Sequence, residues 1–240
     1  MRILLVNPNM TQAMTDTMSD IARSLAGDRA EIVPLTATTG FPYIASRAEA
    51  QVAGGIALGM IAEHIEDVDA VIIAAFGDPG LAAAREVFDV PVVGMAEAAV
   101  LTAAMLGERL SIVTFSPVMR RWYTDCVHAT GLGVRFAGVR TPDAHGDDVA
   151  NAARDMRAEL VALARRAVAE DGADVVILGG APLAGLAPEV ASEIPAIVID
   201  PIAAAVAQAM TLASLRLRLE GRACKPVAKG SVGLLSLIHI

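Results

Sequence analysis

Residues 71–100 read VIIAAFGDPGLAAAREVFDVPVVGMAEAAV, and residues 176–204 read VILGGAPLAGLAPEVASEIPAIVIDPIAA. Each stretch passes from an apolar run through a glycine-containing loop and a short helical segment into a second apolar run. Ala75 aligns with Gly180, and Gly80 aligns with Gly185, at the same shift of 105 positions. Because self-similarity is the signature of a repeated unit, the chain is predicted to hold two copies of one unit, over about 1–100 and 108–205.

The rest of the chain extends this pattern. Pro8 and Met10 align with Pro117 and Met119 at a similar shift of 109. Apolar runs that predict strands alternate with Ala-rich segments that have helical spacing. The predicted strands are 2–6, 30–35, 70–75, 91–95, 110–114, 134–140, 174–178 and 195–199. The predicted helices are 11–26, 46–66, 81–88, 96–107, 117–130, 147–171, 187–192 and 201–219.

Several of these strands are apolar throughout, as parallel strands covered on both faces are. Strands that alternate with helices indicate an α/β fold with parallel sheets. We therefore expect two pseudo-symmetric lobes, each a four-stranded, mainly parallel sheet flanked by helices, with a ligand cleft between them. The expected division is 1–107, 108–205, and a segment 206–240 that holds a C-terminal helix, an arm and an apolar tail. The last helix is a candidate to pack on the first lobe.

Composition narrows the function classes. The chain has 240 residues, 55% of them hydrophobic and only 3% aromatic, with a net charge of −8. So acidic a chain argues against nucleic acid as a partner, because binding to nucleic acid depends on Lys and Arg that neutralise phosphates. Two cysteines and a strand-like N-terminus predict a cytoplasmic protein without a signal peptide. We expect no membrane span, a small-molecule ligand and a homo-oligomer.

Four helix starts are marked. Ser46 and Glu49 have the spacing of a capping box. Asp78, Ser116 and Asp200 each precede a proline, which predicts a capping side chain followed by Pro at the first helical position. The last three lie at or just beyond the ends of predicted strands, so their free amides are expected at the carboxyl edge of a sheet, where ligands of α/β proteins bind.

Small polar residues and glycines fill the loops at these strand ends. They predict a site for a small polar molecule, uncharged or anionic, although Asn and Ser also simply close turns. The predicted ligand-binding residues are Asn7, Asn9, Tyr43, Ser46, Phe76, Gly77, Thr114, Ser116 and Ala181.

Familiar catalytic groups are missing from the same loops. No histidine lies at a strand end, Cys126 falls inside a predicted helix, and Cys224 falls in a late loop. The chain has neither a dinucleotide-binding glycine motif nor a P-loop. We therefore expect no metal and no cofactor. Asp78 is the carboxylate that could act as a base, and capping is its alternative role.

Four motifs together resemble one family, the hydantoin racemases, within the aspartate/glutamate racemase superfamily. They are Asn7-Pro-Asn-Met-Thr11, Phe76-Gly-Asp-Pro-Gly-Leu81, Pro91-Val-Val-Gly-Met-Ala-Glu97 and Leu178-Gly-Gly-Ala-Pro-Leu-Ala-Gly-Leu186. The resemblance covers about 1–205 and implies two α/β lobes with the ligand between them. It also implies two cysteines, one from each lobe, because inversion needs an acid and a base on opposite sides of the substrate carbon.

The two positions that the resemblance assigns to these cysteines are Ala75 and Gly180. Neither side chain can carry a proton, and neither Cys126 nor Cys224 takes their place in the sequence. We therefore expect a racemase-family protein acting on the C–H of a small cyclic imide or amino-acid derivative, with its activity impaired or altered. The alternatives are a non-catalytic small-molecule binding protein, or a thiol-independent isomerase, decarboxylase or lyase with Asp78, Tyr43 or a bound water as the substitute base. A further alternative is that Ala75 is an engineered replacement of cysteine.

The substrate stays open among 5-substituted hydantoins, allantoin-like ureides, amino acids and substituted malonates. The predicted cleft loops lack Lys and Arg. Because dicarboxylates usually need such charge-assisted partners, the sequence favours a neutral imide.

Overall fold

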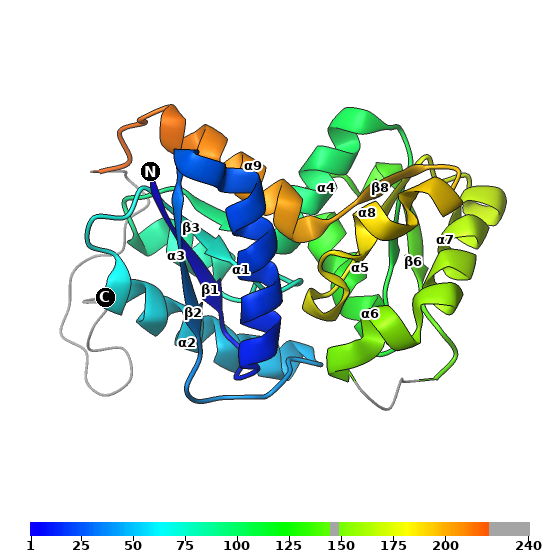
Figure 1. Cartoon of the computed structure of the whole chain (residues 1–240), viewed down its shortest axis with the longest axis horizontal. Coiled ribbons are helices and arrows are strands. Elements are labelled where there is room, and N and C mark those ends of the chain that lie inside the picture. The colour runs from blue at the N-terminus through cyan, green and yellow to red at the C-terminus, as the bar shows by residue number, and fades with distance from the viewer. Residues whose placement is uncertain (145–148, 221–240) are drawn as a thin grey trace.

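Two parallel sheets of four strands each form the core of the molecule. The computed structural model describes residues 1–144 and 149–220. Lobe 1 contains the sheet β2-β1-β3-β4, and lobe 2 contains the sheet β6-β5-β7-β8, with every strand pair parallel. The strands are β1 (Arg2–Asn7), β2 (Glu31–Thr36), β3 (Ala70–Ile73), β4 (Val92–Gly94), β5 (Leu110–Val113), β6 (Phe136–Arg140), β7 (Val175–Leu178) and β8 (Ile197–Ile199). The predicted fold class of two four-stranded α/β lobes is confirmed (Figure 1).

Helices flank both sheets. They are α1 (Gln12–Ala26), α2 (Arg47–His64), α3 (Leu81–Val87), α4 (Met95–Leu106), α5 (Met119–Ala129), α6 (Ala152–Asp155), α7 (Arg157–Asp171), α8 (Leu186–Val190) and α9 (Pro201–Ser214). The single helix predicted over 147–171 is wrong, because the chain breaks at Met156 between α6 and α7. The helix predicted over 201–219 ends earlier, at Ser214. None of the described helices combines the length and the apolar character needed to cross a bilayer.

The strand register measures the internal repeat. Val6 of β1 pairs with Ile73 of β3, and Val113 of β5 pairs with Leu178 of β7. The second pair repeats the first, so the shift is 105 positions between β3 and β7 and 107 positions between β1 and β5. The predicted shift of 105 agrees with this register. The shift of 109 inferred from Pro8 and Met10 exceeds the strand register by two residues, because the loop after β5 differs from the loop after β1.

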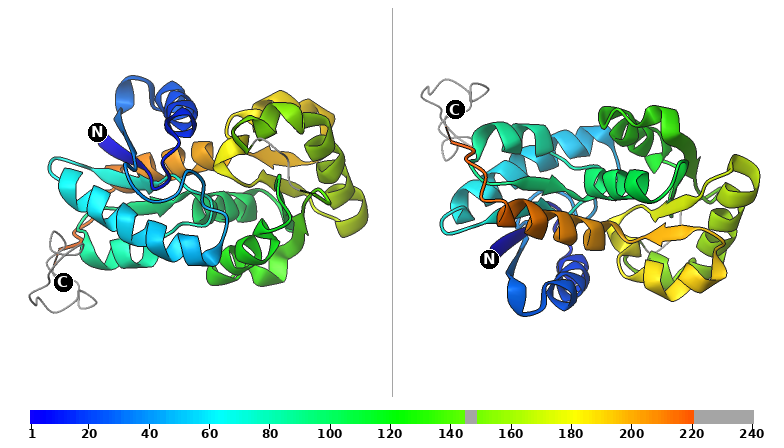
Figure 2. Two further views of the ribbon diagram at one scale, coloured as in Figure 1. Left: turned by 90° about the horizontal axis from the view of Figure 1, so that it is seen from below. Right: turned by 90° about the horizontal axis from the view of Figure 1, so that it is seen from above.

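The helix that follows the fourth strand of each lobe crosses to the other lobe. α4 leaves lobe 1 and packs on β5, β7 and β8, whereas α9 leaves lobe 2 and packs on α1, β3 and β4. The two helices also pack on each other, and Gln208 Nε2 donates to Ala98 O at 2.9 Å and to Thr102 Oγ1 at 3.0 Å across this contact. Figures 1 and 2 show α9 running back from lobe 2 along lobe 1. One apolar cluster therefore spans both lobes, and each lobe also has a separate cluster on the other face of its sheet.

Small side chains permit this close packing of helices. The buried face of α4 includes Ala96, Ala99 and Ala103, and that of α9 includes Ala205 and Ala209. Burial of apolar surface stabilises packing by roughly 25 cal/mol per Å². Because α4 buries its apolar face mainly on lobe 2 and α9 buries its own on lobe 1, each helix is stabilised by the opposite lobe. The boundaries 1–107 and 108–205 remain a prediction, and most of the segment 206–240, including Cys224 and the apolar tail, lies outside the described residues.

Two of the four marked helix starts have the predicted caps. Ser46 Oγ accepts from the Glu49 amide at 3.1 Å, and Asp200 Oδ1 accepts from the amides of Ile202 and Ala203. The prediction is wrong for Asp78, because α3 begins at Leu81 and the residue in the capping position is Gly80, which has no side chain to accept from the helix amides. It is also wrong for Ser116, because α5 begins at Met119 and has no side-chain cap.

Candidate functional site

The loops that follow β1, β3, β5 and β7 gather at the carboxyl ends of the two sheets. Ala74 N donates to Val6 O and Gly179 N donates to Val113 O, each at 2.8 Å. These two bonds extend the β3–β1 and β7–β5 ladders by one residue each. They leave Ala75 and Gly180 at equivalent places, one residue beyond the sheet edge, and both residues are buried.

Asn7 and Asn9 form a hydrogen-bond network of their own. Asn7 Nδ2 donates to Asn9 Oδ1 at 3.1 Å and to Thr15 Oγ1 at 2.9 Å, while Asn7 Oδ1 accepts from the Asn9 amide. Both N–H groups of Asn7 are therefore used within the protein. Asn9 Oδ1 also accepts from the Thr11 amide, but Asn9 Nδ2 reaches only the sulfur of Met14 at 3.7 Å. Asn9 is thus the asparagine whose amide retains capacity for a ligand.

An aromatic cluster joins the loops of the two lobes. The Tyr43 ring, from the loop before α2, lies 5.8 Å from the Phe115 ring, and the Phe76 ring lies 4.6 Å from the Tyr123 ring in an edge-on arrangement. Trp122 packs beside Tyr123 at 5.7 Å. The cluster contains the single tryptophan and both tyrosines of the chain. Only 3% of the residues are aromatic, so this cluster gathers at one location the aromatic side chains that can also form hydrogen bonds.

Tyr43 and Phe76 were expected here from the sequence, and Phe115, Trp122 and Tyr123 were missed. Phe115 lies between two predicted ligand residues, Thr114 and Ser116, in a loop that the sequence places at the cleft, but it is not among the predicted ligand residues. Trp122 and Tyr123 lie in α5, on its buried face. Their signal in the sequence is that they are adjacent aromatic residues in a chain that has few.

Two hydroxyl oxygens in this region lack a well-formed hydrogen bond, although the Thr114 hydroxyl lies near enough to Tyr123 to favour the ionised form of that phenol. Among the buried side-chain polar atoms of the described residues, these are Tyr43 Oη and Thr114 Oγ1. The first comes from lobe 1 and the second from the end of β5 in lobe 2. Leaving a buried polar group unpaired costs about 1–3 kcal/mol, so these oxygens mark places where a ligand or water completes the structure.

Gly180 has a backbone conformation suited to glycine. Its φ is +126°, and a Cβ added there would lie 2.7 Å from Phe115 Cε1. Side chains of L-residues rarely adopt that φ, and the contact is shorter than real Cβ atoms make. Ala75 is not among the described residues with positive φ. The two equivalent positions therefore differ in what they can hold.

Gly77 likewise has no room for a side chain, because its φ is +116° and the Trp122 ring occupies the place where a Cβ would lie. The other predicted ligand residues have different surroundings. Ser46 caps α2, and its oxygen is used by the Glu49 amide. Ser116 is buried, and its carbonyl accepts from the Met119 amide. Ala181 is buried at the start of a 3-10 turn, η4 (Ala181–Leu183).

Asp78 braces a different helix from the one it precedes. Its Oδ1 accepts from the Ala96 amide at 2.8 Å and its Oδ2 accepts from the Glu97 amide at 2.7 Å, which are the first-turn amides of α4. Burial raises the pKa of the Asp78 carboxyl to about 7, and these two bonds only partly oppose that effect. Both oxygens are engaged, and the residue is held at φ +50°.

Cys126 lines a cavity of about 280 Å³ together with Gly77 and Asp78. Burial raises the pKa of its thiol to about 12, so the group is a neutral thiol at physiological pH. Cys126 therefore lacks the thiolate character of a reactive cysteine. Among the described residues, no cluster of three or more His, Cys, Asp or Glu side chains could hold a metal ion.

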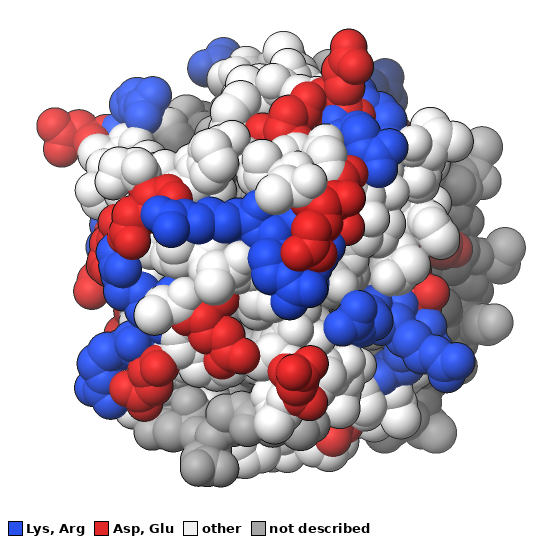
Figure 3. Space-filling view, turned by 90° about the vertical axis from the view of Figure 1, so that its right-hand side faces the viewer, with Lys and Arg blue, Asp and Glu red and all other residues white. Residues whose placement is uncertain are grey.

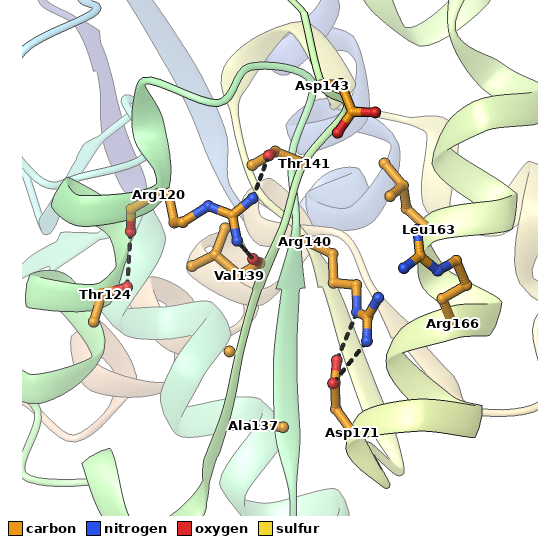
Figure 4. Close-up of a pocket in the computed structure, with 11 residues that line it drawn as sticks. Arg120, Thr124, Ala137, Val139, Arg140, Thr141, Asp143, Leu163, Arg166 and Asp171 are labelled. Carbon is orange, nitrogen blue, oxygen red and sulfur yellow. Dashed lines mark hydrogen bonds and ion pairs between the residues drawn. The ribbon is translucent and has the colours of Figure 1, made fainter.

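A second cavity, of about 430 Å³, lies at the free edge of β6 and is lined by three arginines. Figure 4 shows that Arg140 pairs with Asp171, while Arg120 donates to Val139 O and Thr141 Oγ1. Arg166 pairs with Glu170. The guanidinium groups thus cover the sheet edge, two of them paired with carboxylates and Arg120 held by a carbonyl and a hydroxyl. Figure 3, which views the lobe 2 end, likewise shows acidic and basic side chains interspersed rather than gathered by sign.

This architecture and these motifs define one class of protein. The model of the Asp/Glu/hydantoin racemase family matches residues 3–209, and the chain belongs to this family. The hydantoin racemase of Pseudomonas sp. (strain NS671) is 37% identical over 219 residues, which are 90% of this chain and 87% of that protein. The hydantoin racemase of Paenarthrobacter aurescens is 34% identical over 220 residues, 90% of this chain and 92% of that protein. The allantoin racemase structure from Klebsiella pneumoniae is 32% identical with a TM-score of 0.91, and the match covers 99% of this chain and 98% of that one.

Proposed function

We propose that the chain binds a small, uncharged cyclic ureide of the hydantoin or allantoin type between its lobes and acts on the C–H bond beside the ureide carbonyl. The observation that carries this proposal is the pair of unpartnered hydroxyls, Tyr43 Oη and Thr114 Oγ1, which come from the two lobes. A ring with carbonyl and N–H groups offers partners to both. The names of the relatives agree with this substrate class.

Charge around the site supports a neutral ligand. Arg47 and Arg85 approach this region, but the first is paired with Asp125 and the second with Glu97. With both of these arginines already paired, a dicarboxylate would be buried here without a free cation from the described part of the chain, which is costly. An imide carbonyl needs only neutral donors, and such donors also stabilise the charge that develops on oxygen when the adjacent carbon loses a proton.

We also propose that Ala75 and Gly180 stand where two thiols act in this family. A chain without both thiols does not invert its substrate by the two-thiol route. Its chemistry is therefore altered or lost, and a binding protein is the competing function. The two functions differ in one observable, which is exchange of the substrate proton.

The test uses single enantiomers of 5-benzylhydantoin and of allantoin. Calorimetry measures binding, and proton NMR in D₂O follows deuterium at the chiral carbon while polarimetry follows rotation. Binding with exchange above the protein-free control supports an enzyme. Binding without exchange supports the binding protein, and the Ala75→Cys variant then shows whether one restored thiol is enough. Absence of binding to both ureides contradicts the proposed ligand class.

A further inference from the structure

In lobe 2, two aromatic side chains surround the position where a residue other than Gly180 would carry its side chain. Phe115 occupies the space that a Cβ at Gly180 would enter, at 2.7 Å. The oxygen nearest to that same point is Tyr123 Oη, at 3.6 Å. A polar hydrogen-bearing atom is therefore present within a few ångströms of the place that a side chain at position 180 would occupy.

Tyr123 also reaches the lobe 1 half of the site. Its ring lies against Phe76, the residue that follows Ala75, with ring centres 4.6 Å apart. The side chain is 2% exposed, and Trp122 packs beside it. Tyr123 thus touches the loop after β3 and approaches the loop after β7, and it is fixed between them.

We propose, on the basis of the ureide-binding function above, that Tyr123 is the proton-carrying residue of this site and that it acts on one face of the substrate carbon. No corresponding group is present at Ala75, whose side chain is a methyl. A proton that is removed and returned by one residue comes back to the same face. The expected reaction is exchange of the C–H proton with retention of configuration, and not racemisation.

The step balances within the site. Burial keeps most of Tyr123 as the neutral phenol, so the step runs through the small fraction that is ionised. This phenolate takes the proton from the substrate carbon, and the electron pair of the broken C–H bond moves into the enolate of the adjacent carbonyl. Tyr43 and Thr114 supply hydrogen bonds for that oxygen. The phenol exchanges its hydrogen with solvent and returns a deuteron to the same carbon in D₂O, which regenerates the phenolate.

The pH profile identifies the base. Burial raises the pKa of Tyr123 well above its ordinary value. The titratable groups that act on it are Cys126 on α5, Asp78 before α3 and Tyr43 before α2. If Tyr123 is the base, the rate rises about tenfold per pH unit, with no plateau below about pH 10. If Asp78 is the base, the rate levels off above about pH 7.

The first experiment compares the wild-type chain with Tyr123→Phe, which keeps the ring and removes the oxygen. We expect wild-type protein to introduce deuterium into one enantiomer of 5-benzylhydantoin without loss of rotation. Tyr123→Phe should lower the exchange above the protein-free control by at least about 100-fold, with the dissociation constant changed less than about threefold. Unchanged exchange in Tyr123→Phe, exchange with inversion, or a plateau above pH 7 overturns the proposal while leaving the ureide function intact. Binding without exchange in the wild-type chain also overturns it. Loss of binding in the wild-type chain removes the ureide function and this proposal together.

A second variant keeps the proposal testable if Tyr123→Phe folds poorly. The chain has only two tyrosines. Labelling the Tyr43→Phe variant with 3-fluorotyrosine therefore modifies Tyr123 alone and lowers the pKa of its phenol. The exchange rate of the labelled protein at a given pH should exceed that of unlabelled Tyr43→Phe. An identical pH profile for the two proteins contradicts the role of Tyr123.

Discussion

Asp78 and Asp200 each connect two loops at the carboxyl end of one sheet, but from opposite members of the loop pair. Asp78 lies after β3 and accepts from amides after β4, whereas Asp200 lies after β8 and accepts from the Gly185 amide after β7 as well as from its own helix. In both lobes a carboxylate thus joins the two neighbouring loops by hydrogen bonds, but the carboxylate comes from a different loop in each lobe. This difference sets the first prediction.

Asp78 should make the protein less stable as the pH rises. Its folded pKa of about 7 lies above the ordinary value of 3.8, so between these values the folded state binds more protons than the unfolded state. The free energy of unfolding then falls as pH increases from about 4 to about 7. Urea unfolding of wild type and Asp78→Asn at pH 4.5 and pH 7.5 measures this. The wild type should lose stability relative to the variant on going to pH 7.5, and an equal change in both proteins contradicts the prediction.

Asp174→Asn is the matched contrast of opposite sign. Asp174 accepts from the amides of Glu108 and Arg109, which lower the pKa of its carboxyl. Its contribution is therefore present above its unfolded pKa and declines as pH falls through the lowered one. Urea titrations at pH 7.5 and at about pH 2.5 should show Asp174→Asn losing most relative to wild type at pH 7.5, with the difference shrinking at the lower pH.

Position 180 should tolerate a side chain far less well than position 75. Gly180→Ala combines a φ that disfavours L-residues with a contact against Phe115, and we expect a loss of at least about 1–3 kcal/mol. Ala75→Cys adds one sulfur atom at a position without this strain, and we expect a loss below about 1.5 kcal/mol. Thermal unfolding of the two single variants compares them directly. Equal midpoints would mean that the loop after β7 rearranges freely.

Removing the unpaired hydroxyls should stabilise the protein without ligand and weaken ligand binding. Thr114→Val replaces a buried oxygen by a methyl of similar size and should raise the free energy of unfolding by about 1 kcal/mol. Calorimetry with 5-benzylhydantoin should show weaker binding by the same variant. Ser111→Ala is the control, because Ser111 Oγ donates to Gly138 O at 2.9 Å and its removal should destabilise.

The ion pair between Arg47 and Asp125 should restrain local opening of the loop 37–46 more than it raises the free energy of unfolding of the whole protein. Arg47 begins α2, next to the loop that carries Tyr43, and it also donates to Arg121 O of lobe 2. Both side chains are more than half exposed, so the pair contributes less than about 1 kcal/mol. Arg47→Ala should nevertheless increase amide hydrogen exchange in residues 37–46, with little change in the thermal midpoint. Unchanged exchange in that loop would show that the Tyr43–Phe115 contact holds it alone.

The sequence predicted the strands well, because parallel strands that are covered on both faces consist mostly of consecutive apolar residues. Each one is present with its ends within two residues of the prediction. The role of Asp78 was not predictable, since its partners begin another helix eighteen residues later. Trp122 and Tyr123 were hidden because their spacing also fits an ordinary helix face. The crossing of α4 to lobe 2 depends on packing between distant segments, which local patterns do not encode.

The crossing of α4 and α9 between the lobes has a consequence for synthesis. When the first 107 residues have left the ribosome, β3 and β4 still lack the helix that covers them, and α4 lacks the sheet on which it rests. That cover is α9, Pro201–Ser214, which is among the last of the described elements to be made. We therefore expect lobe 1 to keep apolar surface of β3 and β4 exposed until lobe 2 has been translated. The two lobes then reach their final packing together.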